Sequence, residues 1–263
     1  IYKTDTTAIK KIKLSTLKSS KKENIEKIEK EARLHGIING SCVSVFFNND
    51  NGYIIMERAE MSLKDYLKEN KPKTKELFEE FIRLAKTIIT LHATSIYHND
   101  IKPENILVVT QNPLRLIFTD FTQSSFDNKP SFTGTLAYKS PLLSKLENKK
   151  QDTFSLAMLF INLFIDTIGT FPPFNEDFED KIFQYYKDLI SQLRIQLNSL
   201  NKTEQNIEVV IEAVVHQVSL IILSLGKEGS IKDLIKTIED LINTIYKDYK
   251  IFIQMSLTNE FNK

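Results

Sequence analysis

The eight residues from His98 to Asn105, which read HNDIKPEN, constrain this chain more than any other segment. They gather an aspartate, a lysine and an asparagine on one short loop that also contains a proline. A helix-favouring stretch, 74–93, precedes the loop, and a β-prone run, 105–109, follows it. Such a loop can be a plain connection, but loops at these boundaries also carry chemistry. The segment therefore predicts a helix-to-strand boundary at which polar side chains converge.

The spacing of apolar residues predicts a small β-rich part in the first 58 residues. Alternation around Ile9 is typical of a strand, and the next apolar residues recur at helical spacing. Two β-prone runs then flank a turn-rich connection, 48–52, which is typical of a hairpin. The expected strand, helix and two hairpin strands are 2–14, 21–38, 43–47 and 53–56.

The chain after residue 58 is predicted to be mainly helical, apart from a second hairpin, 105–109 with 114–119. The helical pattern is expected at 62–70, at 74–93 and from Asp152 to the C-terminus, with breaks at Phe171–Phe174 and around Gly226–Ser230. The run from Phe154 to Ile168 contains polar residues and is too short to span a bilayer, so a buried helix is expected there.

Composition limits what the chain binds as a whole. Its 263 residues, 41% of them hydrophobic, suffice for one large domain or two lobes. With 35 basic and 34 acidic residues the net charge is +1, so no overall charge attracts nucleic acid or a membrane surface. Cys42 is the sole cysteine, which excludes an internal disulfide. Neither a secretory leader nor a membrane-spanning run is seen, so an intracellular location, cytoplasmic or nuclear, is expected.

Phosphoryl transfer requires cations for the nucleotide phosphates, oxygen ligands for Mg²⁺ and a carboxylate that orients the attacking hydroxyl. The HNDIKPEN segment resembles the catalytic loop of protein kinases, which reads HRDxKPxN in the serine/threonine form, and five of six specified positions match. The resemblance implies that Asp100 accepts or orients the proton of the substrate hydroxyl. It also implies that Lys102 steadies the transferred phosphoryl group and that Asn105 binds a metal ion.

Three further segments follow in the order that this family has. The run IFTDFT resembles the DFG element, which implies that Asp120 chelates Mg²⁺. The run GTLAYKSP is similar to GTxxYxAP, which implies that Thr135 hydrogen-bonds Asp100 and Lys102. The run QDTFSL is similar to DxWSLG, which implies that Asp152 holds the backbone of the catalytic loop. Taken alone, Asp152 is equally an ordinary helix N-cap.

The run TAIK resembles the VAIK strand, which implies that Lys10 contacts the α- and β-phosphates of ATP. Lys11 and Lys13 are the rivals, but both point to the opposite face of a regular strand. Ala8 shares the face of Lys10 and fits the roof over adenine. A bulge would shift this alternation, so Lys11 and Lys13 stay open as alternatives.

The resemblance also assigns an ion-pair partner and an adenine pocket. The partner of Lys10 is expected to be Glu31 on the following helix, with Glu29 and Glu26 as alternatives. The run YIIMERA resembles the last strand of the small lobe as it enters the hinge, with Met56 as gatekeeper. The residues expected around adenine are Ala8, Met56, Glu57, Ala59 and, as the floor opposite Ala8, Leu107.

Four departures concern the nucleotide lid, regulation and scaffold. No GxGxxG loop lies in the nine residues before Lys10, and a start at isoleucine keeps both truncation and true loss open. Asn99 replaces the arginine of HRD, so control by activation-loop phosphorylation is doubtful. Thr122 replaces the glycine of DFG. Leu142 replaces the glutamate of APE, and apolar packing by Leu142 and Leu143 is expected instead of a buried ion pair.

Together these segments predict an α+β, two-lobed protein-kinase-like fold. A single domain, 1–263, is expected, with an N-lobe of 1–58 that is truncated at its start and a C-lobe of 59–263. The predicted function is a serine/threonine protein kinase that uses ATP and Mg²⁺ and acts on a protein substrate. A pseudokinase that binds nucleotide without transfer is the main alternative, and a kinase of small-molecule hydroxyls is a weaker one. The sequence indicates no partner among nucleic acids or membranes and leaves the oligomeric state open.

Overall fold

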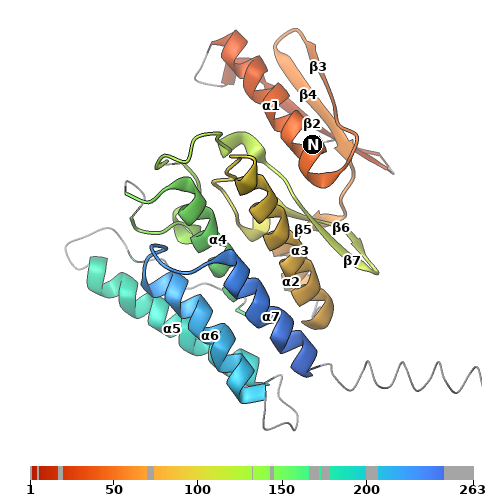
Figure 1. The fold of residues 1–263 in the computed structure, drawn as a ribbon. Helices are drawn as coiled ribbons and strands as arrows, with labels where there is room; N and C mark the ends of the chain where they lie inside the picture. The colour runs from red at the N-terminus through yellow and green to blue at the C-terminus, as the bar shows by residue number, and fades with distance from the viewer. Residues whose placement is uncertain are drawn as a thin grey trace, which may run out of the picture.

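The computed structural model of the chain describes residues 2–245 except 5, 17–19, 70–73, 132, 143–144, 166–171, 173–177 and 200–206. The described residues form a small part with strands and one helix, and a larger part that is mainly helical (Figure 1). This is the α+β, two-lobed arrangement that the sequence predicts.

The small part contains one helix beside an antiparallel sheet. Its elements are β1 (Tyr2–Lys3), β2 (Thr7–Lys13), α1 (Lys21–Asn39), β3 (Ser44–Asn48) and β4 (Asn51–Glu57). Helix α1 begins at a reciprocal cap, in which the Ser20 hydroxyl accepts from the backbone of Glu23 and the Glu23 carboxylate accepts from the backbone of Ser20. It ends at Gly40, whose φ of +62° is a conformation that glycine adopts readily.

The sheet of the small part has the strand order β1-β2-β4-β3. Its register places Ala8 opposite Met56 and Lys10 opposite Ile54. Burial alternates along β4, so one face of the sheet packs against α1 in a separate apolar core. That core consists of Ala8, Leu14, Ile28, Ala32, Ile54 and Met56. The register therefore fixes which side chains of β2 face the rest of the molecule.

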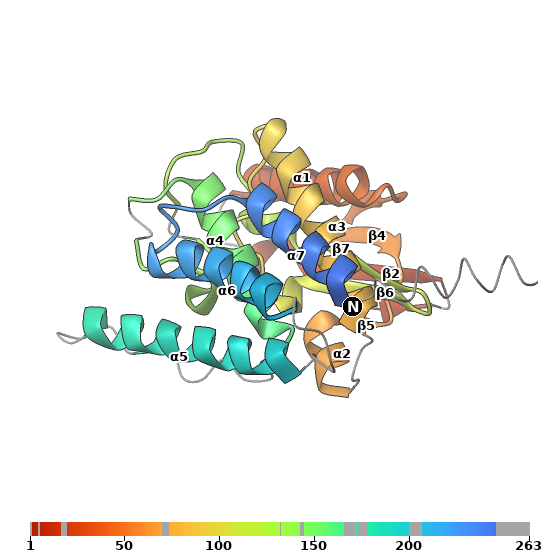
Figure 2. The same ribbon diagram turned by 60° about the horizontal axis from the view of Figure 1, so that its bottom comes forward.

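The larger part combines a three-stranded sheet with six helices in the part of the chain that the structure describes. Its elements are β5 (Met61–Ser62), α2 (Leu63–Glu69), α3 (Thr74–Ala93), β6 (Ile106–Gln111), β7 (Leu114–Phe118), α4 (Asn148–Asn162), α5 (Phe178–Ser199), α6 (Ile207–Leu223) and α7 (Ile231–Ile245). Figure 2 shows α5, α6 and α7 stacked beside α4 and α3. The helix predicted at 74–93 is confirmed at the same residues.

Helix α4 is the centre of the large apolar core. All residues from Gln151 to Ile161 are buried, which confirms the predicted buried helix from Phe154 as far as Asn162, where α4 ends. Residues 163–165 of the predicted stretch are not helical, and 166–168 lie outside the described residues. The helix begins at Asn148 with Glu147 as N-cap, so the alternative role of Asp152 as an N-cap is wrong. Among the helices that the structure describes, none is both long and apolar enough to cross a membrane. The centre of the large part is therefore a helix that other elements cover on every side.

The two predicted helix breaks have different outcomes. The break at Phe171–Phe174 lies almost entirely outside the described residues, as does the chain after Ile245. The break around Gly226–Ser230 is confirmed, because it separates α6 from α7. Gly226 and Gly229 have φ values of +85° and +87°, which explains why glycine suits this turn.

Helix α1 also contacts the larger part. Its Leu34 belongs to the large apolar core, and the amide of Asn39 donates to the backbone oxygen of Phe118 at 2.8 Å. Because these contacts fix α1 against both sheets, they also fix the position of the acidic side chains in its middle turns.

Candidate active site

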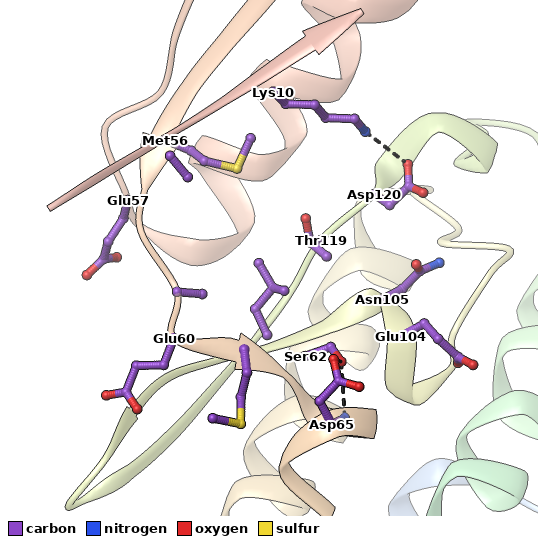
Figure 3. Close-up of a pocket in the computed structure, with 14 residues that line it drawn as sticks. Lys10, Met56, Glu57, Glu60, Ser62, Asp65, Glu104, Asn105, Thr119 and Asp120 are labelled. Atoms are coloured by element: carbon purple, nitrogen blue, oxygen red, sulfur yellow. Dashed lines mark hydrogen bonds and ion pairs between the residues drawn. The ribbon is translucent and has the colours of Figure 1, made fainter. Parts of the chain in front are cut away.

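A cleft of about 470 Å³ lies where the small sheet meets the larger part (Figure 3). The predicted residues that line it are Ala8, Lys10, Met56, Glu57, Ala59, Asn105, Leu107 and Asp120. Ala8 and Met56 come from adjacent strands of the small sheet, whereas Leu107 comes from β6. Apolar walls with a few converging polar groups are typical of a small-molecule site. The structure therefore brings the residues predicted around adenine into one pocket.

Lys10 joins the two parts across this cleft. Its Nζ lies 2.6 Å from a carboxylate oxygen of Glu31 and 3.5 Å from one of Asp120. Figure 3 shows Lys10 and Asp120 pointing toward each other. Burial lowers the pKa of Lys10, but the charges of Glu31 and Asp120 outweigh that effect and hold it above its usual value. Lys10 is therefore a charged ammonium aimed into the pocket.

The rivals of these two residues lie elsewhere. Lys11 and Lys13 are exposed, as are Glu26 and Glu29, whereas Glu31 is only 4% exposed. The strand has no bulge between Thr7 and Lys13, so the alternation that favours Lys10 holds. The structure thus pairs the lysine and the glutamate that the sequence analysis preferred.

Asp100 lies at the centre of the HNDIKPEN loop and is held by four donors. Its Oδ1 accepts from the backbone N–H and the hydroxyl of Thr135, at 2.8 and 2.9 Å. Its Oδ2 accepts from the amide of Asn105 at 2.7 Å and lies 2.9 Å from the Nζ of Lys102. Lys102 also donates to the Thr135 hydroxyl at 2.6 Å, as the resemblance implied. Thr135, and with it the GTLAYKSP run that closes the activation segment in the family pattern, is therefore tied directly to the loop.

These contacts keep the Asp100 carboxylate ionised. Burial alone would raise its pKa, but hydrogen bonds from Lys102 and Thr135, together with the charge of Lys102, hold it below the usual value. An ionised carboxylate at a fixed position can orient a hydroxyl and accept its proton late in a transfer.

Asp120 follows the end of β7 after one residue, Thr119, and lines the same pocket as Asn105. The backbone N–H of Thr119 donates to the backbone oxygen of Asn105 at 3.0 Å, which joins the end of β7 to the loop. Asp120 has a φ of +58°, an uncommon conformation for a residue other than glycine. The Thr122 hydroxyl donates to its Oδ1 at 2.7 Å. The threonine that replaces glycine thus adds a bond that orients this carboxylate.

A buried carboxylate supports the loop from behind. Asp152 is fully buried, and its two oxygens accept from the backbone N–H groups of His98 and Asn99, both at 2.9 Å. His92 Nε2 lies 3.0 Å from the same carboxylate. The role implied for Asp152 is therefore what the structure shows. His92 was not predicted, because its partner lies 60 residues away and no motif of the sequence analysis joins the two.

Sequence reasoning missed several residues that line the pocket. They are Glu60, Met61, Ser62, Asp65, Glu104 and Thr119. Their position in the sequence could have indicated most of them, because they follow the predicted hinge or lie next to a predicted site residue. Ser62 and Asp65 are joined by a 2.7 Å hydrogen bond at the start of α2, which presents a hydroxyl and a carboxylate to the rim of the cleft.

Of the two leucines expected to pack here, only Leu142 is described, and its neighbour Leu146 is more deeply buried. Leu142 is only half-buried and Leu143 lies outside the described residues, whereas Leu146 is 6% exposed. A methyl carbon of Leu146 lies beside Gly226, 2.8 Å from where a β-carbon there would sit. The apolar contact thus forms with Leu146 at the turn between α6 and α7.

The oxygen ligands that Asn105 and Asp120 offer suit Mg²⁺, which needs few ligands from the protein when phosphates and water supply the others. Among the described residues, no group of three or more His, Cys, Asp or Glu side chains could hold a metal ion. Asn105 and Asp120 supply one amide and one carboxylate beside the charge of Lys10. Mg²⁺ in phosphoryl-transfer sites is held by one or two protein oxygens together with phosphates and water. The residues therefore fit Mg²⁺ bound together with a nucleotide.

Comparison with known proteins decides the family. The chain matches the sequence model of the protein kinase domain over residues 2–248. The chain belongs to the protein kinase domain family. Members of this family use ATP and Mg²⁺ and act on protein substrates. The small part with its sheet and one helix and the larger, mainly helical part of this kinase domain fit the fold of that family.

Three relatives of this kinase domain carry the name of a serine/threonine kinase. It is 30% identical over 188 residues to a probable serine/threonine-protein kinase of Dictyostelium discoideum, which is 65% of this chain and 28% of the relative. It is 28% identical over 179 residues to human serine/threonine-protein kinase D2, or 64% of this chain and 20% of that protein. It is 32% identical over 156 residues to serine/threonine-protein kinase cds1 of Schizosaccharomyces pombe, or 52% and 32%. The aligned part of this chain thus covers a third or less of each relative.

Proposed function

We propose that this kinase domain transfers the γ-phosphate of ATP to a serine or threonine hydroxyl of a protein. The observation that carries the proposal is that the side chains of Asp100, Lys102 and Thr135 each contact the other two. A lysine two residues after the aspartate, bonded to a threonine of the activation segment, is the serine/threonine form of the pattern. The names of the relatives point to the same substrate class.

Nucleotide binding is assigned to the cleft. Adenine is proposed to lie between Ala8 and Leu107, beside Met56 and the backbone of Glu57 and Ala59, all of which line the pocket. In this proposal 1–263 is a single domain in which residues 1–58 form the N-lobe and 59–263 the C-lobe.

The phosphates are proposed to meet Lys10 while Glu31 holds that side chain in place. The distance of 2.6 Å between Lys10 and Glu31 supports this, because a lysine fixed by a buried glutamate loses less freedom when it binds an anion. Asn105 and Asp120 are the residues that would hold Mg²⁺. When bound, Mg²⁺ neutralises negative charge on the phosphate oxygens.

The protein's own part in the transfer is positioning. Asp100 orients the substrate hydroxyl and takes up its proton as the oxygen attacks phosphorus. Lys102 lies 2.9 Å from the Asp100 carboxylate, so its positive charge also lies close to the phosphoryl group in transit. Thr135 keeps both side chains in register with the activation segment. The protein thus supplies fixed charges and a proton acceptor without a covalent intermediate.

Transfer of radiolabelled phosphate from ATP to a generic protein substrate tests this function. Asp100→Asn keeps the shape of the side chain and removes the proton acceptor, so we expect label incorporation to fall roughly 10²- to 10⁴-fold. Asp240→Asn, at an exposed position on α7, is the matched control and should leave the rate unchanged. Wild-type label no higher than that of Asp100→Asn would contradict the proposal. If ATP still stabilised the protein in that case, nucleotide binding without transfer would be its activity.

A further inference from the structure

A second cavity, of about 540 Å³, lies where the end of α3 meets the beginnings of α4 and α7. It shares no lining residue with the nucleotide pocket. Lys149, Lys150 and Lys232 line it, and Glu147 is the one acidic side chain among its described lining residues. Glu147 is engaged, since its carboxylate accepts from the Asn128 amide at 2.9 Å. The cavity therefore carries an excess of positive charge.

The three lysines are available for an anion. None of them forms an ion pair with another residue in the part of the chain that the structure describes. Lys149 and Lys232 are exposed, and the half-buried Lys150 reaches the backbone oxygen of Gly229 at 3.4 Å, a long hydrogen bond. Three ammonium groups around one cavity repel each other, and a doubly charged oxyanion relieves that repulsion. Lysine binds phosphate as a point charge without demanding a fixed geometry.

The remaining lining argues for a small organic phosphate and against a bare ion. Ile89, Ala93 and Ile231 give the cavity an apolar wall, and Thr153 and Ser230 add hydroxyl groups. The volume lies within the range of about 300 to 1,000 Å³ that is typical of small-molecule pockets. Inorganic phosphate would leave the apolar wall without a partner, whereas a phosphate monoester has a body to cover it.

The cavity also touches the support of the catalytic loop. His92 lines it, and its Nε2 lies 3.0 Å from the buried Asp152 carboxylate. That carboxylate accepts from the backbone of His98 and Asn99, the two residues before Asp100. A ligand in the cavity therefore lies two contacts away from the backbone that positions Asp100.

We propose that this cavity is a binding site for a small phosphate monoester. Lys149, Lys150 and Lys232 hold the phosphate, and the wall formed by α3 and α7 covers the organic part. Its consequence for catalysis rests on the proposed kinase activity: a bound ligand changes the transfer rate through His92 and Asp152. Binding itself does not depend on that activity.

Thermal unfolding at constant ionic strength tests the site, with free O-phosphoserine as the probe. At about ten times the dissociation constant we expect the melting temperature of the wild-type protein to rise by about 3 °C. The triple variant Lys149→Gln, Lys150→Gln and Lys232→Gln should show no shift. The triple variant Lys13→Gln, Lys22→Gln and Lys187→Gln is the control, because it removes the same charge at exposed positions outside the cavity and should keep the full shift.

Two further measurements test where phosphoserine binds and which class of ligand the cavity accepts. Lys10→Met, which alters only the nucleotide pocket, should keep the shift; loss of the shift there would overturn the proposal by placing phosphoserine in that pocket. Equal shifts in the wild type and the cavity triple variant would also overturn it. A shift with a phosphoserine peptide but none with free phosphoserine would overturn the small-molecule class.

The transfer assay separates this site from the proposed function. In the wild-type protein phosphoserine should change the transfer rate at least twofold, and in the cavity triple variant it should not. Binding without a change in rate would overturn the coupling through His92. A protein that binds phosphoserine in the cavity but transfers no phosphate with or without it would overturn the proposed function and leave the binding site supported.

Discussion

The catalytic loop has a cleft side and a core side, and the chain satisfies their polar groups differently. On the cleft side, Asp100 accepts four contacts from Thr135, Asn105 and Lys102. Lys102 is itself bonded to Thr135, so the side chains support each other. A network in which each member has partners fixes one geometry before a substrate arrives.

The core side buries polar atoms that find no partner in the described part of the chain. They are the Oδ1 of Asn99, the Nζ of Lys139, the Nε2 of Gln151 and the Nε2 of His98. Lys139 is only 2% exposed, and burial lowers its pKa although Asp152 and Asp100 act against that. A buried amine without a partner costs free energy of folding. Asp152, by contrast, has partners for both of its oxygens on this side.

The two sides therefore differ in the network around Asp100, in which each side chain has a partner, although Glu31 and Glu104 at the cleft each keep one buried oxygen without a partner in the described part of the chain. Asn99 stands where the family has an arginine, and its φ of +66° suits asparagine better than most residues. Its side-chain amide donates to the backbone oxygen of Gln123 and to the Ser125 hydroxyl. Substitutions on the two sides should accordingly have different effects.

The largest effect is expected for Asp152→Ala, which removes the carboxylate that holds the loop backbone on the core side. It leaves the backbone N–H groups of His98 and Asn99 without their acceptor. We expect the free energy of unfolding to fall by roughly 3 to 5 kcal/mol and transfer to fall more than about 100-fold. Urea unfolding and initial rates measure both. Asp188→Ala, on the exposed face of α5, is the control, and similar losses in the two variants would refute the assignment.

Acid should reveal the next largest effect, through His35. This buried side chain of α1 packs edge-on against Phe121, and neither ring nitrogen has a partner in the described structure. Burial, together with the charge of Lys10, lowers its pKa to about 4. Between pH 6.5 and 4 the unfolded chain binds a proton at His35 that the folded chain does not. The free energy of unfolding therefore decreases as the pH is lowered through this range.

His35→Leu removes this proton uptake and measures its size. We expect the wild-type protein to lose about 3 kcal/mol more than the variant between pH 7 and 4, because 2.5 pH units at about 1.36 kcal/mol each set the upper limit. Unfolding by urea at several pH values gives the difference. Parallel pH curves for the two proteins would show that His35 does not titrate in this range.

Lys139→Leu should stabilise the protein, which is the opposite of what most core substitutions do. The change removes a buried amine without a partner and keeps an apolar side chain of similar reach. We expect the unfolding free energy to rise by about 1 to 3 kcal/mol. Lys187→Leu on the exposed face of α5 serves as control and should change it by less than about 0.5 kcal/mol. Destabilisation by Lys139→Leu would show that its amine has a partner in solution.

The smallest effect is expected at Thr122, which bonds Asp120 on the cleft side. Thr122→Val removes the hydroxyl and keeps the branched shape, so one orienting bond of about 1 kcal/mol is lost. We expect kcat/KM for ATP at limiting Mg²⁺ to fall about fivefold. Thr122→Ser keeps the hydroxyl and should remain close to wild type. A serine variant as impaired as the valine variant would attribute the effect to backbone shape.

Much of the cleft side was predictable from the sequence because its contacts join short motifs of fixed order. Lys10, Asn105 and Asp120 line one pocket, and Asp100 is hydrogen-bonded to Asn105 and Thr135. Strand alternation was enough to separate Lys10 from its rivals, since β2 has no bulge. The helices followed from apolar spacing, which is strongest for long amphipathic segments such as α3.

The core side was less predictable, because its contacts depend on packing between distant segments. His92 meets Asp152 across 60 residues, and Lys139 is buried although lysine is usually exposed. The start of α4 was placed four residues late, since Asn148 and Glu147 were not recognised as its beginning. The cavity lined by lysines is likewise assembled from three separate helices. No local sequence pattern predicts that residues of separate helices will line one cavity.

The comparison of the two sides is tested most directly by the transfer rates of Lys102→Ala and Lys139→Leu at saturating ATP. Both variants remove one lysine near Asp100, the first from the cleft side and the second from the core side. We predict that Lys102→Ala lowers the rate roughly 100-fold, while Lys139→Leu stays within about threefold of the wild type. Equal losses of rate in the two variants would contradict the account.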